Sequence, residues 1–391
     1  MTKGLNSNDV KIGNRSKVLR ILRNEKQVSR KDLSDQLGLT KSAITGIISE
    51  LIDERIIVET GYQETGAIGR NKIMLELNKS YGYVLGLSIC ETHLTLLIAN
   101  VLGETLDVYE YEFLDDKIYT NQEMIELVVE KSILLLWNNG IDRNHVIGLG
   151  IGYIGQMNTM DIQKIENELS ERLKLRVVAE NNVKALAMSQ MDFTNEMMSE
   201  DFLFVKYGPG LGMSIVQNGK IIDGFENRAG EIGHTIVDMN ANTSCRCGRK
   251  GCLESLISEK GIIKDIQKLG EAYKPLIINK KLSIIDYAQV NELIESGDQA
   301  ICDIFEPRYD YFAKALANVI ILFNPEYVCV YGAIFNQPTI FGMIKSRVDS
   351  YLGANTKSRI KLSSLDPSNN AIGSAALALR HLFYNVGGIK G

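Results

Sequence analysis

The spacing of hydrophobic residues near the start of the chain predicts three short helices. Apolar side chains recur at helical intervals at Val18, Leu19, Ile21 and Leu22. Two further helical patterns follow in VSRKDLSDQLGLTKSAITGIISELIDERIIVET, with a break at Gly38-Leu39. Ser29 is placed to cap the first of these helices, and Thr40 the second, which runs to roughly Arg55. Two helices joined by a tight glycine-containing turn predict a helix-turn-helix.

The next segment has the pattern of a β-hairpin wing. IIVETGYQETGAIGRNKIMLELN alternates apolar and polar residues around a glycine-rich turn with Gly69-Arg70 at its tip. In a winged helix-turn-helix, the second helix of the pair enters the major groove N-terminus first, and a wing reaches a minor groove or phosphate. The side chains expected to face DNA are Arg30, Lys31, Thr40, Lys41, Ser42, Thr45 and Arg70. The supporting core is expected at Leu33, Leu37, Ile44, Ile48 and Leu51.

From about residue 81 the pattern becomes that of an α/β protein. GYVLGLSICETHLTLLIANVLGETLDVYEYEF predicts consecutive strands, and a helix at about 121–140, a strand at 146–155, a helix, the strand RVVAE and a further helix follow. A second such half begins with FLFVKYGPGLGMSIVQNGKII. Two similar halves favour a ligand site where strand ends and helix N-termini converge. Trp137 is expected in the core.

Composition and charge add a partner and a compartment. The 391 residues, 45% of them hydrophobic, suffice for two or three domains. Residues 1–80 carry 14 Lys/Arg against 10 Asp/Glu, whereas the rest carries 29 against 38. A protein-interaction module would share the helical pattern, but the basic bias and the small polar residues at the expected recognition face favour DNA. Without an apolar N-terminal region or a membrane-spanning run, the chain is expected to be cytoplasmic.

Residues 234–255, HTIVDMNANTSCRCGRKGCLES, gather three of the six cysteines behind a histidine. Such a cluster either binds a metal or forms disulfides. In a reducing cytosol thiols stay reduced, which favours a metal. Buried thiols beside a loop histidine are the alternative, but Cys-x-Cys-x₄-Cys with interposed glycines is rare by chance.

The segment AGEIGHTIVDMNANTSCRCGRKGCLES resembles the signature of the ROK family (repressors, open reading frames, kinases). The resemblance runs from about Ser16 to Leu382 and implies a two-lobed actin-like, ribonuclease-H-type sugar-kinase fold behind the winged helix-turn-helix. It implies one structural zinc ion with the ligands His234, Cys245, Cys247 and Cys252. Three cysteines and one histidine suit tetrahedral coordination of zinc. It implies sugar contacts from Asn181, Asn182, Glu231, His234 and Glu254. Asn181 and Asn182 are equally suited to capping the helix that follows them.

The motifs that ROK kinases use for phosphoryl transfer are altered here. Asn182 stands where the resemblance implies the catalytic aspartate, and an amide cannot accept the substrate proton. The first phosphate loop, Ser88 to Thr92, has lost both glycines, and GPGLG has Pro209 in place of a threonine. The body is therefore expected to bind a ligand without being an enzyme.

The sequence therefore predicts a repressor of carbohydrate-utilisation genes with a sugar or sugar-phosphate effector. Residues 1–80 would form the DNA-binding domain, and residues 81–391 the sensing and dimerisation domain, with the zinc loop at 234–254. The expected partner is a near-palindromic double-stranded operator, bound by a homodimer or a dimer of dimers. Three alternatives stay open: an active sugar kinase with a DNA-binding head, a ligand-independent repressor controlled by a protein partner, and a zinc sensor.

Overall fold

A computed structural model describes residues 6–63, 72–90, 93–113, 119–154, 161–194, 200–208, 210–241, 243–280, 282, 284–353 and 359–389. The chain divides into two compact units. Unit 1 comprises Met1–Asn195 and Asn369–Gly391, and unit 2 comprises Glu196–Ser368. The predicted domain boundary at residue 80 lies within unit 1. Among the described residues, every helix is too short or too polar to cross a bilayer.

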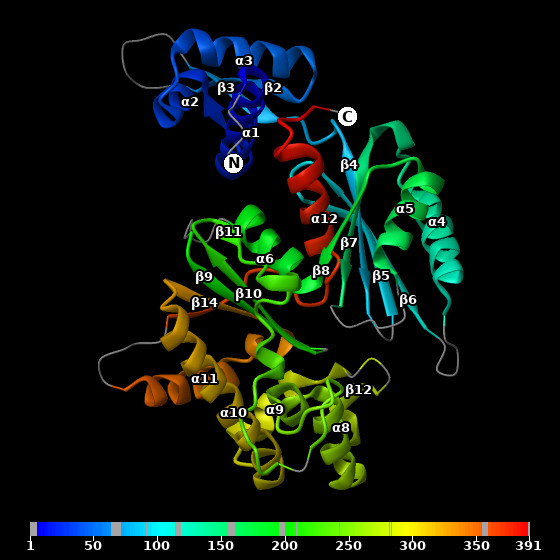
Figure 1. Ribbon diagram of the computed structural model, residues 1–391, viewed down its shortest axis with the longest axis vertical. Coiled ribbons are helices and arrows are strands. Elements are labelled where there is room, and N and C mark those ends of the chain that lie inside the picture. The colour runs from blue at the N-terminus through cyan, green and yellow to red at the C-terminus, as the bar shows by residue number, and fades with distance from the viewer. Residues whose placement is uncertain are drawn as a thin grey trace. The chain divides into compact units, whose positions relative to one another are not determined.

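The first part of unit 1 is the predicted winged helix-turn-helix, called the head below (Figure 1). Its helices are α1 (Ser7–Glu25), α2 (Arg30–Leu37) and α3 (Lys41–Asp53). The Ser29 hydroxyl accepts a hydrogen bond from the backbone N–H of Asp32, and the Thr40 hydroxyl accepts one from that of Ala43. Gly38, at φ 63°, ends α2 in the left-handed conformation that glycine adopts most easily. The predicted caps and the break are therefore confirmed.

The wing is a small sheet in the order β1-β3-β2. Its strands are β1 (Val28–Ser29), β2 (Ile57–Gln63) and β3 (Lys72–Leu77). β3 pairs antiparallel with both neighbours. The predicted wing tip, including Arg70, lies outside the described residues.

The rest of unit 1 is built on a five-stranded sheet in the order β6-β5-β4-β7-β8. Its strands are β4 (Tyr83–Ile89), β5 (His93–Asn100), β6 (Thr105–Glu112), β7 (Val146–Tyr153) and β8 (Val177–Asn181). Its helices are α4 (Asn121–Asn138), α5 (Ile162–Leu173), α6 (Asn182–Phe193) and α12 (Ile372–Leu379). One face packs against α4 and α5, and α12 lies on the other with α6 beside it (Figure 1).

Unit 2 repeats this topology in the order β11-β10-β9-β14-β15. Its sheet strands are β9 (Phe202–Tyr207), β10 (Leu211–Gln217), β11 (Lys220–Ile221), β14 (Tyr327–Tyr331) and β15 (Ile360–Leu362). A separate hairpin pairs β12 (Ile277–Asn279) with β13 (Ile284–Ile285). The helices are α7 (Leu253–Ile257), α8 (Glu259–Lys268), α9 (Tyr287–Glu295), α10 (Gln299–Phe323) and α11 (Pro338–Leu352). Each sheet runs antiparallel through three strands and parallel through the last two, which confirms the predicted ribonuclease-H-type halves.

Glycines in β4 and β7 let α12 lie directly on the sheet of unit 1. A Cβ at Gly150 would lie 1.8 Å from the carbonyl oxygen of Ser374, and one at Gly86 would lie 2.7 Å from that of Ala371. Only glycine allows so close an approach between a strand and a helix backbone. The helix therefore completes the sheet face, although it follows unit 2 in the chain.

One hydrophobic core extends from the head to this sheet face. Its members come from all three parts: Leu19, Leu22, Ile44, Ile48 and Leu51 of the head, Val84, Leu97 and Ala99 of the sheet, and Ala375, Leu379, Phe383 and Tyr384 of the C-terminal segment. The predicted supporting residues of the helix-turn-helix are in it, four fully buried and Leu37 partly buried. The head is thus packed onto the first lobe of the body.

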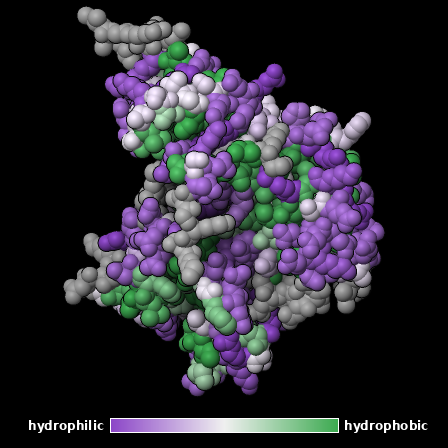
Figure 2. Space-filling model, turned by 45° about the horizontal axis from the view of Figure 1, so that its top comes forward, coloured by the Kyte–Doolittle hydropathy of each residue, from purple (hydrophilic) through white to green (hydrophobic). Residues whose placement is uncertain are grey.

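The prediction for Trp137 is wrong, because its side chain is 82% exposed. The buried face of α4 is formed by Met124, Ile125, Val128, Ser132, Leu135 and Leu136. Trp137 is one residue, or about 100° of helical rotation, beyond this stripe and shares the outer surface with Ile133 and Leu134. Exposed hydrophobic residues also occur elsewhere, and Figure 2 shows hydrophobic patches among mainly hydrophilic residues.

Candidate metal centre, ligand residues and DNA-binding face

The metal-binding candidates are held by the segment between β11 and α7. His234 ends a short 3₁₀ turn, Ile232–His234, and is 5% exposed. This turn lies close to β10, because a Cβ at Gly233 would be 2.5 Å from the carbonyl oxygen of Leu211. The backbone turn that carries His234 is therefore held against the sheet of unit 2.

The cysteines are brought together by a tight double turn. The backbone N–H of Cys245 donates to the carbonyl of Arg249 at 2.8 Å, which closes the first turn around Cys247. Gly248 and Gly251 have φ of 84° and 71°, and a Cβ at Gly251 would lie 2.0 Å from the Asp238 carbonyl oxygen. Glycine is needed at both bends, as the sequence predicts.

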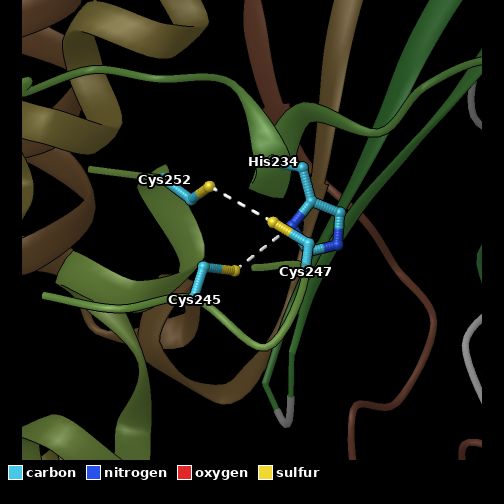
Figure 3. Close-up of side chains that lie close together, drawn as sticks. All are labelled: His234, Cys245, Cys247 and Cys252. Atoms are coloured by element: carbon cyan, nitrogen blue, oxygen red, sulfur yellow. Dashed lines mark hydrogen bonds between the residues drawn. The ribbon is translucent and has the colours of Figure 1, made fainter. Parts of the chain in front are cut away.

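The four candidate ligand atoms lie within 4.8 Å of one another, as Figure 3 shows for His234, Cys245, Cys247 and Cys252. His234 Nδ1 is 3.5 Å from the Cys245 sulfur, and the sulfurs of Cys247 and Cys252 are 3.6 Å apart. Three of the side chains are buried, and Cys247 is partly exposed. A compact Cys₃His set on one loop, with three of its four side chains buried, fits the ligand chemistry of a closed, structural zinc site.

The surroundings of the three thiols shift their pKa values in different directions. The backbone N–H of Arg249 donates to Cys247 and lowers the pKa of that thiol to about 7. Burial raises the pKa of Cys252 to about 12 and also raises the pKa of Cys245. One thiol is thus readily ionised, and a bound cation would favour ionisation of the other two.

The predicted sugar ligands of unit 2 adjoin this cluster. His234 Nε2, on the ring side away from Cys245, is 3.7 Å from a carboxylate oxygen of Glu231. Glu254 accepts a hydrogen bond from the backbone N–H of Leu211 at 3.1 Å and pairs with Arg246 Nε at 3.1 Å. The loop that carries the cysteines therefore also fixes two carboxylates and an imidazole nitrogen, which suit a polyol.

The two predicted asparagines belong to unit 1, at the junction of β8 and α6. The Asn181 side chain accepts from the backbone N–H groups of Val183 at 2.9 Å and Lys184 at 3.4 Å, so it is the N-cap of α6. Asn182 is 7% exposed. The capping alternative is confirmed for Asn181, whereas Asn182 does not cap and is held inside the first turn.

The altered phosphate-loop motifs are only partly described. Ser88 ends up buried at the end of β4, whereas Glu91, Thr92 and Pro209 lie outside the described residues. Beside the second glycine loop, a Cβ at Gly208 would lie 2.9 Å from a Glu259 carboxylate oxygen.

Sequence reasoning missed Glu259. Burial raises the pKa of its carboxyl to about 7, the Tyr287 hydroxyl donates to it at 2.8 Å, and the charge of Lys206 acts on it. Because these partners come from separate strands and helices, one sequence contains no signal that unites them.

Among the described residues, the DNA-binding candidates lie on α2 and in the N-terminal half of α3 with its cap. Thr40, Lys41, Ser42 and Thr45 are exposed at the N-terminal half of α3, opposite the buried face formed by Ile44, Ile47, Ile48 and Leu51. Lys31 is exposed on α2, and Arg30 pairs with Glu59 of the wing at 2.8 Å. The N-terminal half of α3 thus presents a positive charge and hydroxyl groups on one face, while its opposite face is packed in the hydrophobic core. Such a helix is suited to binding in a major groove.

Comparison with known proteins extends these observations. The model of the ROK family matches residues 85–381, and that of winged helix-turn-helix DNA-binding domains matches residues 13–58. The xylose repressor of Bacillus subtilis (strain 168) is 24% identical over 388 residues, which cover 95% of this chain and 96% of that one.

Two solved structures have the same fold. One is a crystal structure of a ROK family transcriptional regulator, a homolog of the E. coli MLC protein, with a TM-score of 0.76 at 23% identity, covering 97% of this chain and 98% of that one. The other is a ROK family glucokinase from Streptomyces griseus in complex with glucose and AMPPNP, with a TM-score of 0.63 at 21% identity, covering 76% of this chain and 100% of that one.

Proposed function

The chain belongs to the ROK family and begins with a winged helix-turn-helix, and from this membership we propose that it is a sugar-responsive transcriptional repressor. The observation that carries the proposal is the union, in one chain, of an exposed recognition face on α3 with a ROK body. The relative with 24% identity over 95% of the chain is named a xylose repressor.

The ligand would be a sugar bound by the polyol-binding side chains of the zinc loop in unit 2. Glu231, His234 and Glu254 offer acceptors and a ring nitrogen beside the cysteines. In unit 1, the buried amide of Asn182 at the start of α6 is a separate candidate for a sugar contact. Hydrogen-bonding groups at fixed positions discriminate between sugars, because a missing hydroxyl leaves a polar group unpaired. D-xylose is the first candidate, because the B. subtilis relative is named for it.

The Cys₃His cluster would hold one zinc ion per chain. The ion would order the loop that positions Glu231 and Glu254, and Nδ1 of His234 would bind it while Nε2 stays on the sugar side. Bound zinc would neutralise the thiolates and fix the histidine tautomer, and it would take no part in chemistry.

The body would bind its sugar without phosphorylating it. The side chain at position 182 is an amide, which cannot act as the base for a sugar hydroxyl. Incubation with ATP and D-xylose, D-glucose or N-acetylglucosamine should yield no sugar phosphate above background, and turnover would favour the kinase instead.

Selection of bound duplexes from a random pool tests the DNA partner. The zinc-loaded full chain should enrich a near-palindromic sequence, since a homodimer presents two heads related by a two-fold axis. Thr45→Ala with Lys41→Ala should abolish enrichment while leaving the far-ultraviolet circular dichroism unchanged. Absence of any enriched sequence for the folded, zinc-loaded chain would contradict the repressor assignment.

Thermal unfolding against D-xylose, N-acetylglucosamine and other sugars, together with their phosphates, tests the effector. A sugar at a hundredfold excess over its dissociation constant should stabilise the native state by about 2.7 kcal/mol. The same sugar should weaken binding to the selected duplex. If every sugar leaves both the thermal unfolding and the duplex binding unchanged, regulation by a protein partner replaces regulation by a sugar as the proposal.

A further inference from the structure

A buried carboxylate at the end of α6 connects that helix to the DNA-binding head. α6 begins at the Asn181 cap and Asn182, and its last turn carries Asp192, which is 5% exposed. With a rise of about 1.5 Å per residue, the helix spans about 18 Å between these two ends. One rigid element therefore runs from the proposed sugar residues to the base of the head.

Three arginines converge on Asp192. Arg20 Nη1 lies 2.7 Å from one carboxylate oxygen, and Arg380 Nη1 lies 3.0 Å from the other. Arg23 Nη1 lies 3.7 Å from the first oxygen. Arg20 and Arg23 belong to α1 of the head, whereas Arg380 directly follows α12. A single carboxylate thus joins the head, α6 and the C-terminal segment.

The surroundings make this junction rigid. The guanidinium carbon of Arg23 lies 4.9 Å from the ring centroids of both Phe193 and Tyr384, and the side chain is 6% exposed. The Tyr384 hydroxyl donates to the carbonyl of Val101 at 2.6 Å, which fixes the ring against the sheet. A buried guanidinium needs a counter-charge, so α1 cannot move from Asp192 without leaving charge unpaired in the protein interior.

The other side of α1 is tied to the recognition helix. Arg15, 2% exposed, pairs through Nη1 with Glu50 of α3 at 3.1 Å and through Nη2 with Glu54, which caps the end of that helix. Its Nε donates to the carbonyl of Gly387 at 2.8 Å. A displacement at the end of α6 would thus be passed to α1 and, through Arg15, to α3.

We propose that Asp192 is the positioning residue that couples the proposed ligand site to the recognition helix, so that a shift of α6 on sugar binding is transmitted to α3. The inference deepens the repressor function proposed above and depends on it for its biological meaning. The mechanical coupling itself requires neither a known sugar nor a known operator. Two arrangements of one helix, each favoured by a different ligand, are what linkage between sites requires.

Hydrogen–deuterium exchange of the full-length chain tests the coupling without either ligand. Asn181→Ala removes the cap of α6 and should accelerate amide exchange in α6 and, by at least about fivefold, in α1 and α3. In the Asp192→Asn background, Asn181→Ala should no longer affect α1 and α3. Exchange confined to α6 in the single variant, or an unchanged response of α1 in the Asp192→Asn background, would overturn the proposal.

Two further variants separate coupling from general instability. Arg20→Gln removes the most accessible of the three arginines and leaves Arg23 and Arg380 beside Asp192. It can therefore replace Asp192→Asn as the background for Asn181→Ala if Asp192→Asn does not fold. Asp265→Asn breaks an Asp–Arg pair of unit 2, with Arg308, and should leave α1 and α3 as responsive to Asn181→Ala as in the parent. Loss of the response in Asp265→Asn as well would show a non-specific effect and reject Asp192 as the coupling residue.

The sugar and DNA assays then distinguish the inference from the proposed function. In Arg20→Gln, the sugar found in the thermal screen should bind within twofold of its parental affinity, while its effect on duplex binding should fall at least about fivefold. A parental protein that responds to no sugar would count against the proposed effector alone. A full sugar response in Arg20→Gln together with one in Asp192→Asn would count against the coupling alone.

Discussion

Units 1 and 2 contain sheets of the same strand order, but different structures are attached to them. In unit 1 the head packs against one sheet face and shares its core with α12 and the C-terminal segment. In unit 2 the segment after β11 forms a cysteine-rich loop beside β10. The difference indicates that the common topology is a support, and that function resides in what each sheet carries.

The largest effect should come from removing the metal cluster from unit 2. Cys252→Ser is expected to reduce bound zinc from one ion per chain to none and to lower the free energy of unfolding by about 4 kcal/mol, because the cysteine-rich loop loses its cross-link. Metal analysis by mass spectrometry and urea unfolding measure both. Cys302→Ser, at a partly buried cysteine of α10 outside the cluster, should retain the ion.

The Cys252→Ser variant would sharpen the comparison between the units if its effect stays within unit 2. Hydrogen exchange should accelerate around Cys245 and α7 and stay unchanged in the head. Equal zinc content in Cys252→Ser and the parent chain would contradict the proposed site.

The close packing of α12 should give the next largest effect, now in unit 1. Gly150→Ala places a methyl group 1.8 Å from the carbonyl oxygen of Ser374, so α12 must shift. We expect this shift to lower the free energy of unfolding by about 3 kcal/mol. The matched change Gly342→Ala in α11 of unit 2 meets no described atom within 4 Å and should be neutral or stabilising by up to about 1 kcal/mol. Urea unfolding compares them, and equal stabilities would refute the packing argument.

The ionisation of Glu259 should make the stability of unit 2 depend on pH. Burial raises the pKa of this carboxyl to about 7 from 4.5, so between these values the folded protein retains a proton that the unfolded chain has lost. Stability therefore falls as the pH rises from about 4.5 to 7 and levels off above. The Tyr287 hydroxyl and Lys206 face the carboxyl and limit the shift.

Glu259→Gln should remove this dependence and stabilise the protein by about 2 kcal/mol at pH 8 relative to the parent. Urea unfolding from pH 5 to pH 8 measures it. The control is Glu271→Gln, at an exposed carboxylate of the same unit, which should keep the parental pH profile. A parental profile in Glu259→Gln would show that another group titrates.

The smallest effect is expected on the DNA-binding face. Lys41→Ala should weaken binding to the selected duplex by about 1 kcal/mol and reduce the slope of log affinity against log salt by about one, because one phosphate contact is lost. Lys345→Ala, exposed on α11 of unit 2, should change neither quantity. Equal losses in both variants would mean that general charge, and not the head, holds the DNA.

Local signals in the sequence predicted the elements well, whereas contacts between distant residues could not be predicted. Ser29, Gly38 and Thr40 specify caps and a turn over a few residues, and the structure confirms them. The local spacing of the cysteines also predicted a metal site, and the resemblance to the ROK family implied the full Cys₃His set. Trp137 was misplaced because one residue of helical phase separates a core position from an exposed one.

The network around Asp192 shows the limit of a single sequence. Its partners Arg20 and Arg380 are separated from it by 172 and 188 positions, and nothing in the local pattern of any of them indicates the pairing. The same applies to Glu259 and Lys206, which come together only when α8 packs near β9. Long-range charge pairing is decided by packing and not by periodicity.

The placement of α12 also affects the order in which the protein can fold during synthesis. Unit 2 is one continuous stretch, so it is able to fold as soon as it leaves the ribosome. Unit 1 must wait for residues 369–389, which cover its sheet and complete the core beneath the head. The DNA-binding head is therefore synthesised before the segment that completes its support, so a chain that lacks this segment would not yet present a fully supported head to DNA.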